Sequence, residues 1–136
     1  MKKPFSAFVA ILILGLSLPG AAQQPRTKDK GAAQLNHMVE LYSQATMGWE
    51  IERRCQHLGS EINPLYALDY AFVSKFMTQL LGAQQVVDIQ KDAARALDSD
   101  PAFDCGVDTV DFAGEAYRIT RNLAASIRAI LAKPNS

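Results

Sequence analysis

The pattern of hydrophobic and polar positions along the chain predicts helices and no strands. In four stretches apolar residues recur every three or four positions, which is the spacing of one face of a helix. No stretch alternates apolar and polar residues with a period of two, and no Asn-Gly or Asp-Gly pair marks a hairpin. The sequence therefore predicts an all-α fold, a four-helix bundle in which short connections alternate the chain direction up, down, up and down.

The first predicted helix covers residues 31–58. Its opening apolar stripe consists of Leu35, Met38, Tyr42, Ala45 and Trp49. Beyond Gly48 the apolar residues move to a nearly opposite side of an ideal helix, so the helix either bends there or is covered on two sides. Because a glycine inside a helix costs about 1 kcal/mol relative to alanine, we expect close packing at Gly48.

The other three helices have recognisable ends. The second is predicted to follow an N-cap at Asn63, with Pro64 as its first residue, and to reach residue 81 before Gly82. The third covers residues 84–97 and ends before Pro101, because proline disfavours helical geometry in the residue that precedes it. The fourth covers residues 108–132 and has the cleanest apolar face.

The broad apolar arc of the second helix predicts a central position for it, and Asp69 falls within this arc. A buried carboxylate is costly unless it is paired or hydrogen-bonded. We expect Asp69 to be a buried polar residue paired with Arg54, Arg121 or a tyrosine hydroxyl. The alternative is a functional acid with a shifted pKa.

Residues 1–22 have the order of a secretory signal peptide. A basic start, Met1-Lys2-Lys3, precedes an apolar run over residues 5–18, and small residues end at Ala22. The run is shorter than the roughly 20 residues that span a membrane, so we expect cleavage and no stable membrane anchor. Residues 23–30 are then a flexible polar segment, residues 31–133 form the helical bundle domain, and the protein is periplasmic or secreted.

Charge excludes some classes of partner. Without Lys2 and Lys3 the chain keeps 12 basic residues against 14 acidic ones. A nucleic-acid-binding protein would carry a strongly basic face, so we expect no nucleic-acid partner.

The expected export determines which state we predict for the two cysteines, Cys55 and Cys105. In an oxidising compartment two cysteines most simply form one disulfide. The up-down order supports this pairing, because it brings the end of the first helix and the start of the fourth to the same end of the bundle. Two free thiols, or two members of a metal site, are the alternatives, although the zinc spacing C-x-x-C is absent.

The same end of the bundle gathers polar and charged residues, and we consider it a candidate surface for binding a partner. Its candidate residues are Trp49, Arg53, Arg54, His57, Asp100 and Asp104. The structural alternative is that acids at the start of one helix and bases at the end of another only complement the helix dipoles.

Known chemical motifs do not fit this sequence. The positions after Asp98 and Asp100 lack the glycine and glutamate of an EF-hand loop. The C-x-x-C-H signature of covalent haem is absent, and so is the G-x-S-x-G motif of a serine nucleophile. Glu50 and Glu52 point to different sides of one helix, which argues against a glycosidase pair. We therefore predict no catalytic residue, no metal and no cofactor.

These observations favour a non-enzymatic exported interaction protein, such as an inhibitor, an immunity protein or a small chaperone, with an envelope protein as its partner. The layout resembles that of small periplasmic binders, among them immunity proteins against secreted cell-wall amidases and acid-stress chaperones with two cysteines. No motif of either group matches these residues, so no residue role is carried over. The alternative function is a small apolar-ligand carrier, whose pocket between the second and fourth helices is lined by Phe72, Phe76, Phe112 and Tyr117.

Overall fold

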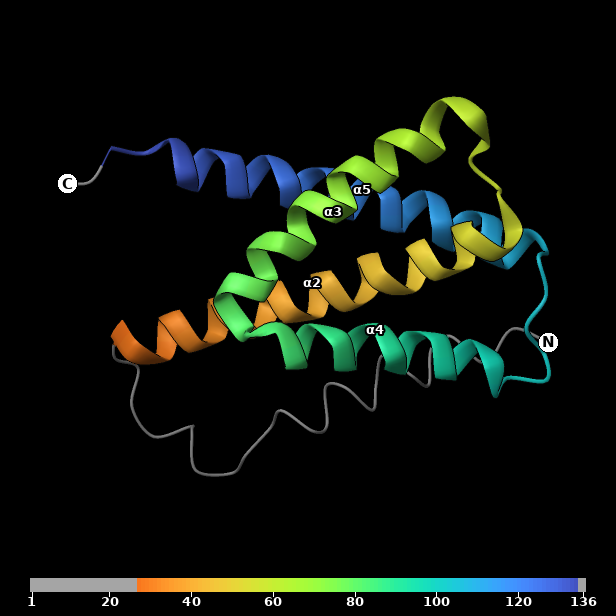
Figure 1. Ribbon diagram of the computed structural model, residues 1–136, viewed down its shortest axis with the longest axis horizontal. Helices are drawn as coiled ribbons and strands as arrows, with labels where there is room; N and C mark the ends of the chain where they lie inside the picture. The colour runs from red at the N-terminus through yellow and green to blue at the C-terminus, as the bar shows by residue number, and fades with distance from the viewer. Residues whose placement is uncertain (1–26, 135–136) are drawn as a thin grey trace. The chain divides into compact units, whose positions relative to one another are not determined.

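The computed structural model describes residues 27–134, and within them the chain forms four α-helices and no β-strand (Figure 1). The helices are α2 (Thr27–Cys55), α3 (Gly59–Leu81), α4 (Ala83–Asp98) and α5 (Val107–Ala132). The all-α class predicted from the apolar periodicity is confirmed. The predicted signal peptide, residues 1–22, lies outside the described residues, as do residues 23–26 of the predicted polar segment.

Most helix ends agree with the sequence prediction to within one residue. This holds for both ends of α4 and of α5, and for the end of α3 at Gly82. The ends of α2 differ more, because α2 begins at Thr27 instead of residue 31 and ends at Cys55 instead of residue 58.

The predicted start of α3 after an Asn63 cap is wrong, because α3 begins at Gly59, five residues before Pro64. The side chain of Asn63 does not cap a helix. It donates from Nδ2 to Glu52 Oε2 at 2.9 Å, a carboxylate on the preceding helix. Pro64 consequently lies inside α3, where it has no N–H to donate to the carbonyl of Ser60.

The chain divides into two compact units, residues 1–40 and 41–136, and α2 contributes to both. In the first unit the side chains of residues 30–40 are all exposed or half-buried. The hydrophobic core described below belongs to the second unit.

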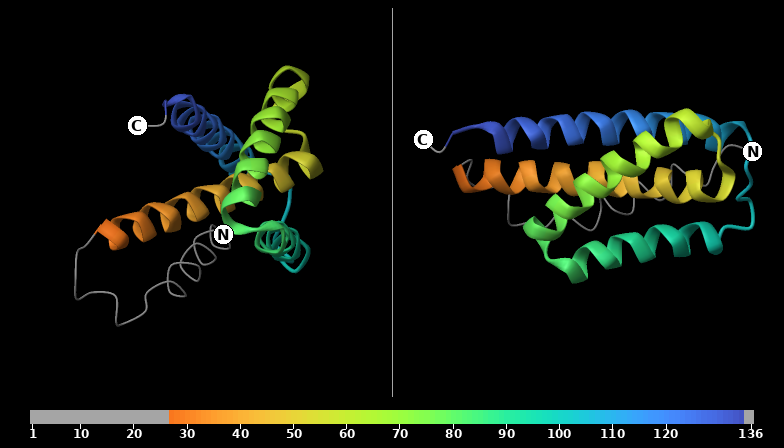
Figure 2. Two further views of the ribbon diagram at one scale, coloured as in Figure 1. Left: turned by 60° about the vertical axis from the view of Figure 1, so that its left-hand side comes forward. Right: turned by 45° about the horizontal axis from the view of Figure 1, so that its top comes forward.

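In the second unit α3 packs more extensively against α5 than against α4. Figure 1 shows α3 crossing α5 obliquely, and Figure 2 shows α4 turning back at the end of α3. Each helix supplies buried apolar residues, and those with no exposed surface are Tyr42, Ala45, Ile51, Tyr66, Val73, Met77, Ala113, Ala124 and Ile127. The apolar arc of α3 is covered on one side only, since Leu68 is 68% exposed.

Gly48 marks a close approach between α2 and α5. A Cβ atom at this position would lie 2.1 Å from the Cβ of Ala116 and 2.7 Å from the hydroxyl oxygen of Tyr66. Both distances are far inside van der Waals contact, so only glycine fits without movement of α5. The close packing expected at Gly48 is confirmed, and α2 continues through this position without interruption.

Buried tyrosines line the inner face of α2 and α3. The hydroxyl of Tyr66 donates to the carbonyl of Ala45 at 2.7 Å. Tyr42 and Tyr70 stack with their ring centroids 5.8 Å apart, and the hydroxyl of Tyr70 lies 3.0 Å from Thr46 Oγ1. These hydrogen bonds satisfy polar atoms that would otherwise be costly to bury.

Burial raises the pKa of both Tyr66 and Tyr70 above the ordinary value of about 10. The unfolded chain loses these protons near pH 10 while the folded chain keeps them, so the unfolded state binds fewer protons there. We expect the free energy of unfolding to fall above about pH 10, by up to about 1.4 kcal/mol per pH unit for each tyrosine. Urea unfolding at a series of alkaline pH values measures this slope, and Tyr66→Phe should reduce it. An unchanged slope in the variant would contradict the prediction.

Candidate functional site at the disulfide-bonded end

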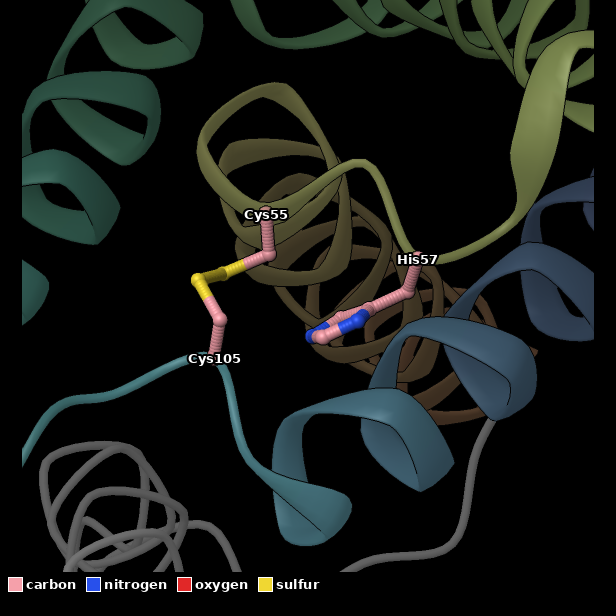
Figure 3. Close-up of side chains that lie close together, drawn as sticks. All are labelled: Cys55, His57 and Cys105. Atoms are coloured by element: carbon pink, nitrogen blue, oxygen red, sulfur yellow. A yellow bond between two sulfur atoms is a disulfide. The ribbon is translucent and has the colours of Figure 1, made fainter.

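A disulfide joins Cys55, the last residue of α2, to Cys105 in the loop before α5 (Figure 3). The two residues are 50 positions apart in sequence, and their Cα atoms lie 5.4 Å apart. The predicted pairing is therefore confirmed. Because disulfides persist in oxidising environments and are rare in the reducing cytoplasm, this bond indicates a location outside the cytoplasm. None of the described helices is long and apolar enough to cross a membrane.

Arg54 connects three segments at this end of the molecule. Its Nη1 atom donates to Asp98 Oδ1 at 2.8 Å, at the end of α4. Its guanidinium carbon lies 5.9 Å from the ring centroid of Phe103, in the loop between α4 and α5. On its own helix, Arg54 Nε lies 3.6 Å from a carboxylate oxygen of Glu50. Single surface ion pairs contribute little, but these contacts together fix the position of the loop.

Two aspartates set the backbone of that loop. Oδ1 of Asp100 accepts a hydrogen bond from the N–H of Ala102 at 2.9 Å. Oδ1 of Asp104 accepts one from the N–H of Gly106 at 3.0 Å. Aspartate side chains favour such turns because they can bind a backbone N–H two residues on. Both predicted site residues therefore have a structural role in shaping the loop that carries Cys105.

His57 lies beside the disulfide, and its imidazole extends toward the sulfur atoms in Figure 3. Nε2 of His57 is 2.8 Å from Oγ1 of Thr109, in the first turn of α5. The single hydroxyl proton of Thr109 is donated to the carbonyl of Gly106 at 2.8 Å. Thr109 Oγ1 must therefore accept from His57, so Nε2 carries a proton and the neutral ring has its lone pair on Nδ1.

Glu52 is a buried carboxylate that the sequence prediction missed. It has no exposed surface, and its oxygens accept from the N–H of Leu58 at 3.1 and 3.3 Å and from Nδ2 of Asn63 at 2.9 Å. It thereby joins the end of α2 to the start of α3. A cavity of about 380 Å³ adjoins it, lined by Glu52, Gln56, Gly59, Ser60, Asn63 and Pro64. The sequence did indicate that Glu52 is buried, since Glu52 continues the spacing of the apolar stripe that ends at Trp49.

The predicted partner-binding residues are not all displayed together. Trp49 is half-buried, with its ring centroid 5.2 Å from that of Tyr66 and 5.9 Å from that of Tyr70. It faces the tyrosines of the core. Arg53 has a side chain that is 59% exposed, and its Nη1 atom lies 2.8 Å from Glu50 Oε1. Arg54, His57 and the loop with its two aspartates surround the disulfide.

Asp69 is paired, but its partner is none of those expected. Its side chain is 16% exposed, and its Oδ1 atom accepts a hydrogen bond from Nη2 of Arg128 on α5 at 3.2 Å. The guanidinium carbon of Arg128 also lies 4.6 Å from the ring centroid of Phe72. This arrangement joins α3 to α5 and gives Asp69 a structural role.

Comparisons with known proteins give no match. No protein-family model matches the sequence, no curated protein is similar to it, and no solved structure matches its fold.

Proposed function

We propose that the protein is a non-enzymatic exported interaction protein, such as an inhibitor, an immunity protein or a small chaperone. It binds an envelope protein partner through the disulfide-bonded end, which we define as Arg53, Arg54, His57 and residues 98–110. The proposal includes two expectations from the sequence, the up-down-up-down order of the helices and a cleaved signal peptide at residues 1–22. It places the protein in the periplasm or outside the cell.

The observation that carries the proposal is a pair of exposed valines that follow the disulfide-bonded Cys105 closely in sequence. Val107 is 75% exposed and Val110 is 41% exposed, in the first turn of α5. Charged residues lie near them in sequence, with Asp104 and Asp108 both exposed. An apolar centre with a charged and polar rim is the usual composition of a protein–protein interface.

The rigidity of this surface supports the same proposal. The loop from α4 to α5 is held by the disulfide, by the two aspartate turns and by Arg54 against Phe103. A surface that is ordered before binding loses less conformational entropy when a partner docks. Such preorganisation serves tight recognition, and it needs no catalytic group.

A matched pair of variants tests the proposal. Val107→Asp places a charge in the centre of the surface, whereas Leu131→Asp changes a residue of similar exposure (60%) near the far end of the same helix. The oxidised protein is used to capture and identify a partner from envelope extracts, and binding to the purified partner is then measured. We expect Val107→Asp to weaken binding by about tenfold or more, with Leu131→Asp close to wild type.

Equal weakening by both variants would overturn the choice of surface. Turnover of an envelope substrate by the purified protein, without any captured partner, would overturn the function.

The carrier alternative has less support. Two of the four side chains expected to line its pocket are engaged within the protein. Phe72 is covered by Arg128, and the ring centroid of Tyr117 lies 5.5 Å from that of Tyr66. The cavity described above lies elsewhere, at the junction of α2 and α3.

A further inference from the structure

Three side chains able to bind a metal ion converge at the disulfide-bonded end. Cys55, His57 and Cys105 can each offer one ligand atom such that all three atoms lie within 4.8 Å of one another. We propose that, once the disulfide is reduced, the two thiolates and the imidazole bind one Zn²⁺ ion. His57 and Cys105 also belong to the surface proposed for partner binding, but zinc binding is measured on the reduced protein without a partner, so the two proposals can be tested independently.

The distances suit a tetrahedral zinc ion after small movements. With Zn–S bonds of about 2.3 Å and a Zn–N bond of about 2.0–2.1 Å, tetrahedral ligand atoms lie roughly 3.5–3.8 Å apart. The present separations of at most 4.8 Å come close to that arrangement. The Cα atoms of the two cysteines, 5.4 Å apart, keep both thiolates within reach of one ion.

The chemistry of the donors favours zinc over harder ions. Two thiolates and one imidazole form a borderline-soft set, which suits Zn²⁺, whereas Mg²⁺ and Ca²⁺ prefer oxygen ligands. Three protein ligands leave the fourth tetrahedral position for water or for a group from a partner.

The surroundings of His57 already have the form found around metal-binding histidines. Such a histidine almost always donates its second ring N–H to an acceptor, which fixes the ring and directs the other nitrogen to the metal. Here Thr109 Oγ1 accepts from Nε2 at 2.8 Å, and Gly106 in turn accepts from Thr109. We assign Nδ1 as the zinc ligand because Nε2 is engaged with Thr109, and the limit of 4.8 Å holds for one of the two ring nitrogens.

The backbone between two of the ligands is unusual as well. Gln56, which separates Cys55 from His57, has a φ of 54°. Residues other than glycine rarely adopt a positive φ, and such strain gathers at functional sites. This conformation ends α2 and allows both neighbours of Gln56 to face Cys105.

Reduction of the bond is chemically balanced when a dithiol supplies the electrons. A thiolate of the dithiol attacks one sulfur, which frees the other cysteine and forms a mixed disulfide. The second thiol of the dithiol then displaces the remaining cysteine, and the dithiol becomes a disulfide. Two electrons pass to the cysteines. Zinc binding then releases the two thiol protons. Cys105 is exposed whereas Cys55 is half-buried, so we expect attack on the disulfide from the side of Cys105.

Zinc titration of the reduced protein tests the proposal. The chain is reduced by a phosphine in the absence of air, and the phosphine becomes a phosphine oxide by taking oxygen from water. A phosphine is used because a dithiol would compete with the protein for zinc. Zn²⁺ alone is then titrated against a chromophoric chelator, with circular dichroism recorded in parallel. We expect one Zn²⁺ per reduced chain and none per oxidised chain.

Variants assign the ligands. Cys55→Ser should abolish binding, and His57→Ala should weaken it by about tenfold or more. His37→Ala removes the other histidine, which is exposed and lies in the first unit, and should match wild type. If reduction lowers the helical signal, zinc should restore it in wild type and fail to do so in His57→Ala. Equal zinc affinity in reduced wild type and His57→Ala would overturn the proposal, as would equal affinity in wild type and Cys55→Ser.

Discussion

Replacing both Cys55 and Cys105 by serine should lower the free energy of unfolding by about 4 kcal/mol. The disulfide closes a loop across a separation of 50 residues. On the chain-entropy model, the conformational entropy that this cross-link removes from the unfolded chain corresponds to about 4 kcal/mol. A domain of this size has a total stability of only about 5–15 kcal/mol, so the loss is a large fraction. Urea unfolding followed by far-UV circular dichroism, with a chelator present to exclude metals, measures it.

Reduction of the wild-type protein is the matched control for this variant. Reduced wild type should lose the same stability as the double serine variant, and the double variant should not respond to reductant. A loss below about 1 kcal/mol in both would mean that the loop is held chiefly by the contacts of Arg54 and of the two aspartates.

Substituting Gly48 by alanine should destabilise the fold by about 3 kcal/mol. The new Cβ would lie 2.1 Å from the Cβ of Ala116 and 2.7 Å from the hydroxyl oxygen of Tyr66. Overpacking of a tight core typically costs about 1–3 kcal/mol, and here the nearest obstacle is a Cβ atom, which can move only with the backbone of α5. Chemical denaturation of the purified variant provides the measurement.

Gly114 offers a control on the facing helix. An added Cβ there meets nothing within 4 Å, so Gly114→Ala should stabilise the protein by up to about 1 kcal/mol through helix propensity alone. Ala116→Gly should restore part of the stability lost in Gly48→Ala, because it removes the closest contact. Similar stabilities for the two single alanine variants would contradict the close approach of α2 and α5.

The features that could be predicted from the sequence depend on local signals or on a chemical constraint. The ends of α4 and α5 follow from their apolar spacing, from Pro101 and from the acids that begin α5, and the structure places them within one residue. The disulfide followed from having two cysteines in a chain that the sequence predicts to be exported.

The features that could not be predicted depend on contacts between distant residues. Asn63 and Pro64 have the local pattern of a helix start, but the true start of α3 depends on the Glu52 carboxylate, which accepts from the N–H of Leu58 across the turn. Asp69 has its partner 59 residues away, at Arg128. No spacing rule reports such pairs, because they arise only when the helices pack.

The cluster of Cys55, His57 and Cys105 could not be predicted for a similar reason. Cys55 and His57 are two residues apart, which is not a known zinc spacing, and the third ligand is on another segment. The turn at Gln56 and the hydrogen bond from His57 to Thr109 bring the three side chains together. Only the folded backbone shows that a structural disulfide has an imidazole beside it.

The covalent ring closed by Cys55 and Cys105 encloses all of α3 and α4, whereas α5 lies outside it. A protease that cuts one peptide bond anywhere within the ring leaves both fragments attached to each other. Proteases are also present outside the cytoplasm, and a molecule nicked within the ring keeps its pieces at the high local concentration that allows them to stay assembled. A cut within α5 has no such protection, because α5 lies outside the ring.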